Sequence, residues 1–108
     1  MKRFDEDEKL LTDMYQDGYF PDFLVDKIKF LLLDVAAFLE TGERKPEKVQ
    51  AKFDEMTLAI NDLQEEFEEN DSEIETGARE SIGESVAYML QWFGIDLDVE
   101  DAIRERDW

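Results

Sequence analysis

The sequence predicts an all-α protein, a compact bundle of four main helices plus a short C-terminal helix, in a single helical domain over residues 1–108. Three observations support this prediction. Apolar residues recur at intervals of three and four, the period of a helix, along most of the chain. The five glycines and two prolines fall mostly between these periodic segments. Aliphatic and aromatic residues make up 43% of the sequence, which is enough for one core without disulfides or metals.

The first expected helix runs from about Asp5 to Gln16, and the turn-forming pair Asp17-Gly18 ends it. Acidic residues in its first turn suit the positive end of the helix dipole. The second expected helix runs from about Pro21 to Thr41, with proline at the first helical position. Apolar side chains occupy nearly its whole circumference, which predicts a central helix surrounded by the others. Gly42 is placed to supply the left-handed residue that ends it.

The third expected helix starts near Pro46 and ends near Glu69. Its apolar residues recur at spacings of four, three, four, three and four, which is an a/d pattern over nearly three heptads. They are Val49, Phe53, Met56, Ile60, Leu63 and Phe67. The pattern predicts an outer helix of the bundle that packs against the second helix, and its alternative is an intermolecular coiled coil.

The fourth expected helix begins at Ser72 and ends before Gly94. Ser72 and Glu75 match the S-x-x-E capping box, in which each side chain accepts a hydrogen bond from a free N–H group of the first turn. Glycine inside a helix costs about 1 kcal/mol relative to alanine. Gly77 and Gly83 therefore predict close packing of a neighbouring helix, with a local weakness as the alternative.

A short final helix is expected after Gly94. Asp98 is placed to cap it, and the helix would run to about Arg106. Trp108 is expected to pack on the body of the protein, because an indole ring is costly to leave in water.

The composition excludes several kinds of chemistry. The chain has no cysteine and no histidine, so disulfides, a thiolate nucleophile and a Ser-His-Asp triad are excluded and the commonest metal ligand is missing. Phosphate-binding and nucleophile-elbow motifs are absent, and so is the calcium-loop signature. The sequence therefore predicts a protein that is not an enzyme and that has no cofactor or metal site.

The charge balance bears on partners and location. Thirty acidic and twelve basic residues give a formal net charge of -18, which disfavours nucleic acid and favours a basic protein as a partner, or serves solubility alone. Acidic residues follow Met1-Lys2-Arg3 where a secretory signal would be apolar. The longest apolar stretch, 28–39, contains Lys29 and Asp34, so no membrane span is expected. The cytoplasm is the expected location.

The candidate binding site is an acidic patch on the third helix and in the loop after it. It consists of Asp62, Glu65, Glu66, Glu68, Glu69, Asp71 and Glu73. No basic residue lies between Lys52 and Arg79. Like charges three or four residues apart on a helix repel, so a sequence that keeps them suggests a positively charged partner. The alternative is a solvated outer face.

Three further features are noted. Asp34 is expected at a polar edge of the apolar helix or paired with a base, and Arg79 is expected to pair with Glu75, four residues before it. Basic residues cluster around the second loop and predict a polar axis, basic at this loop and acidic near Asn70. These basic residues are Arg44, Lys45, Lys48 and Lys52.

Several stretches resemble a family of small bacterial proteins, a domain-of-unknown-function family. They are Tyr19-Phe20-Pro21, Phe23-Leu24-Val25-Asp26-Lys27-Ile28-Lys29, Ile60-Asn61-Asp62-Leu63-Gln64-Glu65-Glu66-Phe67, Ser72-Glu73-Ile74-Glu75-Thr76 with Ala78-Arg79, and Arg106-Asp107-Trp108. The resemblance implies a bacterial origin and a compact helical fold. It carries no activity and no functional residue.

The function expected from these features is a non-enzymatic protein-binding module that acts through the acidic patch; an inhibitor or immunity-type partner of a nuclease toxin is one version. One alternative is a structural module that self-associates through the a/d face of the third helix or through Trp92 and Trp108. Another is a small-ligand-binding protein with a pocket edged by Tyr88, Trp92 and Asp34. The protein is expected to be a monomer or a homodimer.

Overall fold

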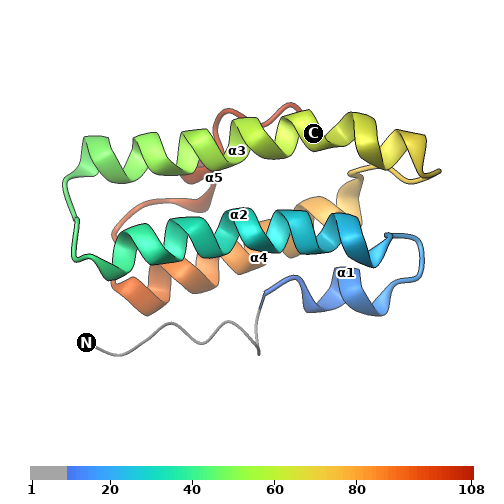
Figure 1. The fold of residues 1–108 in the computed structure, drawn as a ribbon. Coiled ribbons are helices and arrows are strands. Elements are labelled where there is room, and N and C mark those ends of the chain that lie inside the picture. Colours follow the sequence, from blue (N-terminus) through green and yellow to red (C-terminus); the bar gives the residue numbers. More distant parts are fainter. Residues whose placement is uncertain (1–9) are drawn as a thin grey trace.

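Three long helices and two short ones form the described part of the chain, residues 10–108, in the computed structural model (Figure 1). The helices are α1 (Thr12–Gln16), α2 (Asp22–Glu40), α3 (Pro46–Glu69), α4 (Thr76–Phe93) and α5 (Val99–Ala102). These residues contain no strand, so the predicted all-α bundle is confirmed. Of the first expected helix, residues 5–9 lie outside the described residues. The expectation is wrong at Leu10 and Leu11, which are not helical: Leu11 has a φ of 56°, and α1 begins only at Thr12.

Helix α2 begins at Asp22, one residue later than predicted, and Pro21 precedes it in an extended conformation. Gly42 has a φ of 92°, so the predicted left-handed residue after the helix is confirmed. The expectation of a helix surrounded on all sides is wrong. Although α2 packs against α1, α3 and α4, Phe23 is 51% and Phe30 72% exposed. Phe23 and Phe30 of α2 therefore face water.

Helix α3 runs antiparallel to α2 and has the predicted bounds (Figure 1). Five of its six a/d residues are buried, and Leu63 is partly buried against the core. The core of the same chain therefore covers this face, as predicted for an outer helix of the bundle. An intermolecular coiled coil through the same stripe is excluded, because the side chains that would form it are already packed.

The predicted capping box at Ser72 is wrong. The Ser72 N–H donates to Phe67 O (2.8 Å) and the Asp71 N–H donates to Glu68 O (3.1 Å), with Asp71 at a φ of 60°. This pattern is a Schellman motif, so Ser72 belongs to the end of α3. Helix α4 starts four residues later, with Glu75 as an N-cap that forms no side-chain cap hydrogen bond.

The predicted close packing at the glycines of α4 is also wrong. A Cβ atom at Gly77 would meet nothing within 4 Å, and one at Gly83 would lie 4.0 Å from Val99 Cγ1. Ser81 and Ser85 are buried instead, and the Leu11 N–H donates to Ser85 Oγ (2.9 Å). The chain at the start of α1 therefore approaches α4 on the serine side of the helix.

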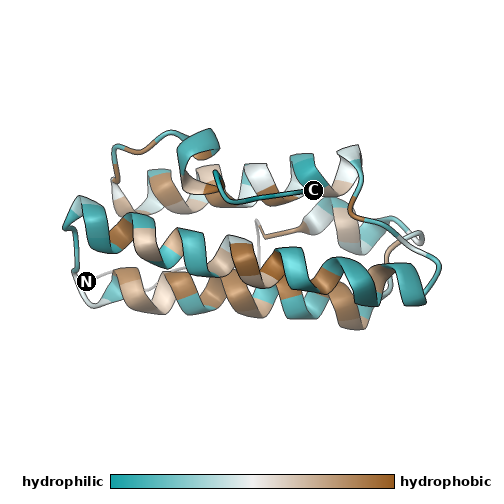
Figure 2. Ribbon diagram, turned by 90° about the horizontal axis from the view of Figure 1, so that it is seen from above, coloured by the Kyte–Doolittle hydropathy of each residue, from teal (hydrophilic) through white to brown (hydrophobic). Residues whose placement is uncertain are grey.

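The C-terminal prediction is largely confirmed. The Asp98 side chain accepts a hydrogen bond from the Glu100 N–H (2.9 Å) and caps α5, although α5 ends at Ala102 rather than near Arg106. Trp108 is buried, with 8% of its surface exposed. Figure 2 shows apolar and polar residues alternating turn by turn along the long helices. Within residues 10–108, every helix is too short or too polar to cross a bilayer.

Candidate protein-binding surface

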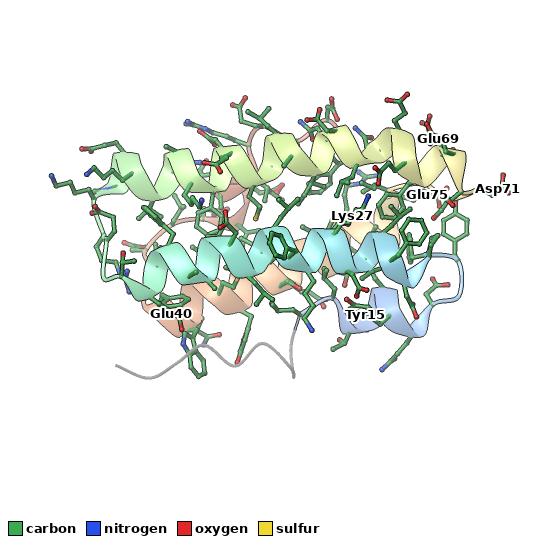
Figure 3. All side chains as sticks on the ribbon, in the orientation of Figure 1. Tyr15, Lys27, Glu40, Glu69, Asp71 and Glu75 are labelled. Carbon is green, nitrogen blue, oxygen red and sulfur yellow. The ribbon has the colours of Figure 1, made fainter. Side chains whose placement is uncertain are left out.

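The acidic patch lies at the end of the bundle where α3 turns into α4. Figure 3 shows Glu69, Asp71 and Glu75 together at this end. Six members of the patch are exposed: Asp62, Glu65, Glu68, Glu69, Asp71 and Glu73. The structure therefore brings most of the predicted residues to one region of the surface, around the last turns of α3 and the loop that follows.

Glu66 differs from the other six carboxylates. Its Oε2 atom lies 2.6 Å from Lys27 Nζ, and the two side chains are 41% and 48% exposed. Glu66 thus sits on the side of α3 that faces α2 and bridges the two helices. An exposed pair of this kind contributes up to about 1 kcal/mol to stability. The expectation that Glu66 forms one open surface with Glu65 is therefore corrected.

The remaining carboxylates of the patch have no basic neighbour among residues 10–108, since none lies within 4.0 Å of a lysine or arginine nitrogen. A hydrogen bond and a like charge from Glu75, together with the charge of Glu68, raise the pKa of Glu73. Tyr19 Oη lies 3.5 Å from Glu75 Oε1, so the loop before α2 borders the patch. Negative charge is therefore crowded at this end of the molecule.

The basic residues lie around the α2–α3 loop, at the opposite end of the bundle (Figure 1). Arg44 Nη1 donates to Leu39 O (2.9 Å) and to Glu43 O (2.7 Å), and its guanidinium lies 5.6 Å from the Phe93 ring centroid. Hydrogen bonds from the backbone N–H groups of Lys45 and Arg44 lower the pKa of Glu43. The molecule therefore has the predicted polar axis.

Two expected ion pairs have different outcomes. Asp34 Oδ2 lies 2.8 Å from Lys52 Nζ, as expected for a carboxylate at a polar edge, and the hydrogen bond to Asp34 raises the pKa of Lys52. Arg79 has no carboxylate within 4.0 Å among the described residues. The expected pair with Glu75 is absent because Glu75 precedes α4 with an extended backbone, at φ -101° and ψ -169°.

A hollow of about 380 Å³ lies between the α2–α3 loop and the segment after α4. It is lined by Arg44, Pro46, Val49, Gly94, Ile95, Asp96 and Leu97. The pocket expected beside Tyr88, Trp92 and Asp34 is not this hollow. Tyr88 and Trp92 lie against each other on α4, with ring centroids 6.1 Å apart. No cluster of three potential metal-ligating side chains occurs in residues 10–108.

The sequence reading missed the exposed aromatic residues of α2. Phe23 and Phe30 are seven residues apart and so lie on one side of the helix. The sequence held a partial signal: Lys27 and Asp34 have the same seven-residue spacing, which places charged residues on this side of α2 but does not show that the phenylalanines are exposed. The prediction of a fully surrounded helix considered the number of apolar residues around α2 and gave too little weight to the charged residues between them.

Comparison with known proteins adds one finding. A family model described as a family of unknown function, DUF5713, matches residues 4–108. The chain belongs to this family. The predicted membership in a family of unknown function is thereby confirmed. No curated protein and no solved structure matches the chain. Because the family has no known function, membership in it assigns no activity to this chain, and the properties of the protein's surface are the basis for a functional proposal.

Proposed function

We propose that this chain is a non-enzymatic protein-binding module whose acidic patch receives a basic protein. The observation that supports this proposal is the state of the patch residues other than Glu66. All six are exposed, and within the described part of the chain none forms an ion pair. A basic partner would supply the positive charges that the chain itself does not place there.

The electrostatics favour such a partner in two ways. Close to the surface, a hydrogen bond with Glu75 and the like charges of Glu75 and Glu68 raise the pKa of Glu73, and an opposing lysine or arginine would offset these charges. At longer range, a net charge of -18 attracts basic proteins and speeds their encounter, with a strong dependence on salt. Both effects act on the same class of partner.

The absence of catalysis is part of the same proposal. The chain contains no histidine and no cysteine, so general acid–base or nucleophilic chemistry would have to rest on carboxylates, hydroxyls or lysines. The patch carboxylates are open to solvent, which is the wrong environment for the strongly shifted pKa values that catalytic carboxylates need.

The experiment is a capture of basic proteins from an extract of the source organism at low salt, followed by titration calorimetry with the protein identified. In the patch variant, lysine replaces Glu65, Glu68 and Glu69. In the matched control, lysine replaces three exposed carboxylates elsewhere, Glu80, Glu84 and Asp96, so that the net charge changes equally.

The patch variant is expected to bind at least tenfold more weakly and with a smaller salt dependence, because it loses contacts between opposite charges. The control is expected to retain affinity within about threefold, since exposed charges farther than about 8 Å from a contact are largely screened at 0.15 M salt. Equal losses in both variants would show that net charge alone matters and would refute a local binding surface. Failure to capture any basic protein would refute it as well.

A further inference from the structure

One face of the bundle keeps large apolar side chains in water. Phe30 is 72% and Phe23 51% exposed, and both lie on the side of α2 next to α3. Two ion pairs show which side this is. Lys27 and Asp34 alternate with the two phenylalanines along α2, so all four residues share one side of the helix. Lys27 pairs with Glu66 of α3 and Asp34 pairs with Lys52 of α3, so this side lies next to α3. Figure 3 shows Lys27 reaching from α2 toward α3.

We call this surface the α2–α3 face. It comprises Phe23, Lys27, Phe30, Leu31, Asp34 and Phe38 of α2 with Lys48, Ala51, Lys52, Glu55, Ala59, Asp62, Leu63 and Glu66 of α3. Exposed aromatic groups gathered on one face are typical of interaction sites rather than of free surface. A partner for this face would have to match both its exposed phenylalanines and the charged residues between them.

Two shallow hollows follow the seam between the helices. One of about 280 Å³ is lined by Lys27, Phe30, Leu31, Ala59 and Leu63. The other, of about 240 Å³, is lined by Phe38, Lys48, Ala51, Lys52 and Glu55. Since Phe30 and Phe38 are eight residues apart on one helix, these hollows are about 12 Å apart along the seam. The lining of the first hollow is mostly apolar with Lys27 beside it, and the second combines Phe38 and Ala51 with the charged Lys48, Lys52 and Glu55.

The charge of this face is nearly balanced, unlike that of the molecule. The α2–α3 face carries three lysines and four carboxylates, whereas the whole chain has twelve basic and thirty acidic residues. The lysines are Lys27, Lys48 and Lys52, and the carboxylates are Asp34, Glu55, Asp62 and Glu66. A nearly neutral face is the part of such an acidic protein that a second copy can approach without strong repulsion.

The order of residues on α2 is symmetric about Phe30 and Leu31. Lys27 comes three residues before Phe30, and Asp34 comes three residues after Leu31. Phe23 comes seven residues before Phe30, and Phe38, at the second hollow, comes seven residues after Leu31. A two-fold axis through this centre would bring each lysine opposite an aspartate of a second copy, and each Phe23 opposite the hollow beside Phe38.

Helix α3 repeats this symmetry. Lys52 and Glu66 each lie seven residues from Ala59, on opposite sides of it. The same two-fold axis would bring Lys52 of one copy opposite Glu66 of the other. At the ends of the face, it would bring the basic loop around Lys48 of one copy near the acidic end of α3 in the other. Charges of opposite sign therefore meet along both helices.

We propose that the α2–α3 face is the interface of a homodimer, in which a two-fold axis passes near Phe30 and Ala59. Helices α2 and α3 of one copy pack antiparallel on the same helices of the other. Phe30 lies at the centre of the interface, and Lys27 of each copy pairs with Asp34 of the other. The occupant of the face is thus a second copy of this chain.

The size of the face is sufficient for this role. Helix α2 has 19 residues, which gives a strip about 28 Å long. Two adjacent helices make it about 20 Å wide, so roughly 1,100 Å² of projected area is covered when both copies are counted. Specific interfaces bury more than about 1,000 Å² in total. The face therefore reaches the lower end of the range for a specific dimer.

The experiment is sedimentation equilibrium of the full chain at 0.15 M salt over a range of micromolar concentrations. The wild-type protein is expected to approach twice the 12.7 kDa mass of one chain. Phe30→Ser is expected to weaken dimerisation at least tenfold, because it removes the central aromatic contact. Tyr19→Ser is the matched control: Tyr19 is 42% exposed in the loop before α2, outside the α2–α3 face, and its replacement is expected to leave the dimer intact.

A charge exchange tests the two-fold arrangement itself. Lys27→Glu and Asp34→Lys are each expected to weaken their own homodimer, since each places like charges opposite one another. An equimolar mixture of the two variants is expected to recover association, because each charge again meets its opposite. Circular dichroism verifies that every variant keeps its helix content.

A wild-type protein that remains monomeric at 100 micromolar would overturn the proposal. An unaffected Phe30→Ser dimer would place the interface elsewhere, and a mixture that fails to associate would refute the antiparallel arrangement. Asp62 and Glu66 belong to both surfaces, but the patch variant replaces Glu65, Glu68 and Glu69, which are not part of the α2–α3 face, so failure of the dimer and failure of the proposed function remain distinguishable.

Discussion

Gly83→Ala is expected to stabilise the protein, although the residue lies inside a helix and borders a groove. Gly83 is in the middle of α4, where glycine costs about 1 kcal/mol relative to alanine because of the backbone freedom that it loses on folding. The nearest atom to an added Cβ is Val99 Cγ1 at 4.0 Å, which is an ordinary van der Waals contact. No neighbouring atom has to move, so the difference in helix propensity between glycine and alanine decides whether the substitution stabilises the protein.

We expect the free energy of unfolding to rise by about 1 kcal/mol, which corresponds to roughly 4 °C in Tm for a chain of this size. Urea unfolding followed by circular dichroism measures this change, and an unchanged slope with denaturant would show that only stability has altered. The expected rise in the free energy of unfolding is close to the difference in helix propensity alone, because one new atomic contact adds only about 0.1–0.2 kcal/mol.

Gly94→Ala is the matched control, because it makes the same chemical change where the backbone is left-handed. Gly94 has a φ of 67°, and its N–H donates to Gln91 O (3.2 Å) in the motif that ends α4. A side chain in this conformation costs roughly 1–2 kcal/mol, so this variant is expected to be less stable than the wild type. A neutral or destabilising Gly83→Ala would refute the reasoning, since it would require close packing over Gly83.

Three further predictions concern stability. Asp71→Gly is expected to raise the free energy of unfolding by about 1 kcal/mol in urea unfolding, because Asp71 has a φ of 60° and glycine adopts this conformation without strain; a loss would contradict this. Ser85→Ala is expected to cost about 1–3 kcal/mol and to speed hydrogen exchange of the Leu11 N–H, which would lose its buried acceptor; unchanged exchange would contradict this. Burial alone would raise the pKa of Asp54, but hydrogen bonds from Arg104 and Gln50 outweigh it and lower that pKa. Asp54 therefore stabilises the fold above its unfolded pKa of about 3.9, and this contribution is lost as the pH falls below it. Urea titrations of Asp54→Asn between pH 3 and pH 6 are expected to show less loss of stability in acid than the wild type, and an equal loss would refute the assignment.

Much of the architecture could be predicted because it depends on periodicity. The a/d stripe of α3 predicted both the bounds of this helix and its buried face, since only one side of a helix with that spacing is apolar. Asp98, Gly42 and Trp108 were also interpreted correctly, because a cap, a left-handed residue and an indole each have strong local preferences.

The interpretations that failed depend on neighbours that are distant in sequence. Ser72 has the local signature of a helix cap, but its N–H donates to Phe67 O and closes α3, and α4 begins at Thr76 without a side-chain cap. Gly83 suggested close packing, yet the space beside it is open enough for a methyl group. In both cases the residue type alone did not determine the environment, which depended on where other segments of the chain lie.

The candidate surface divides in the same way. The sequence alone predicted a run of carboxylates without bases, and six of them are exposed and unpaired within residues 10–108. Only the packing of α2 on α3 revealed that Glu66 pairs with Lys27 and that Phe30 faces water.

The sequence by itself determined that this chain folds as helices, where α2 and α3 approximately begin and end, where α4 ends, and that its charge is strongly negative. These properties follow from local helix propensity, from the spacing of the apolar residues and from the numbers of acidic and basic residues. The tertiary structure alone decided which apolar residues remain exposed, which carboxylates find a lysine, and that one nearly neutral face has a two-fold symmetric order of charges. Those properties depend on the rotation and register of α2 against α3, which arise when the core residues of both helices pack together.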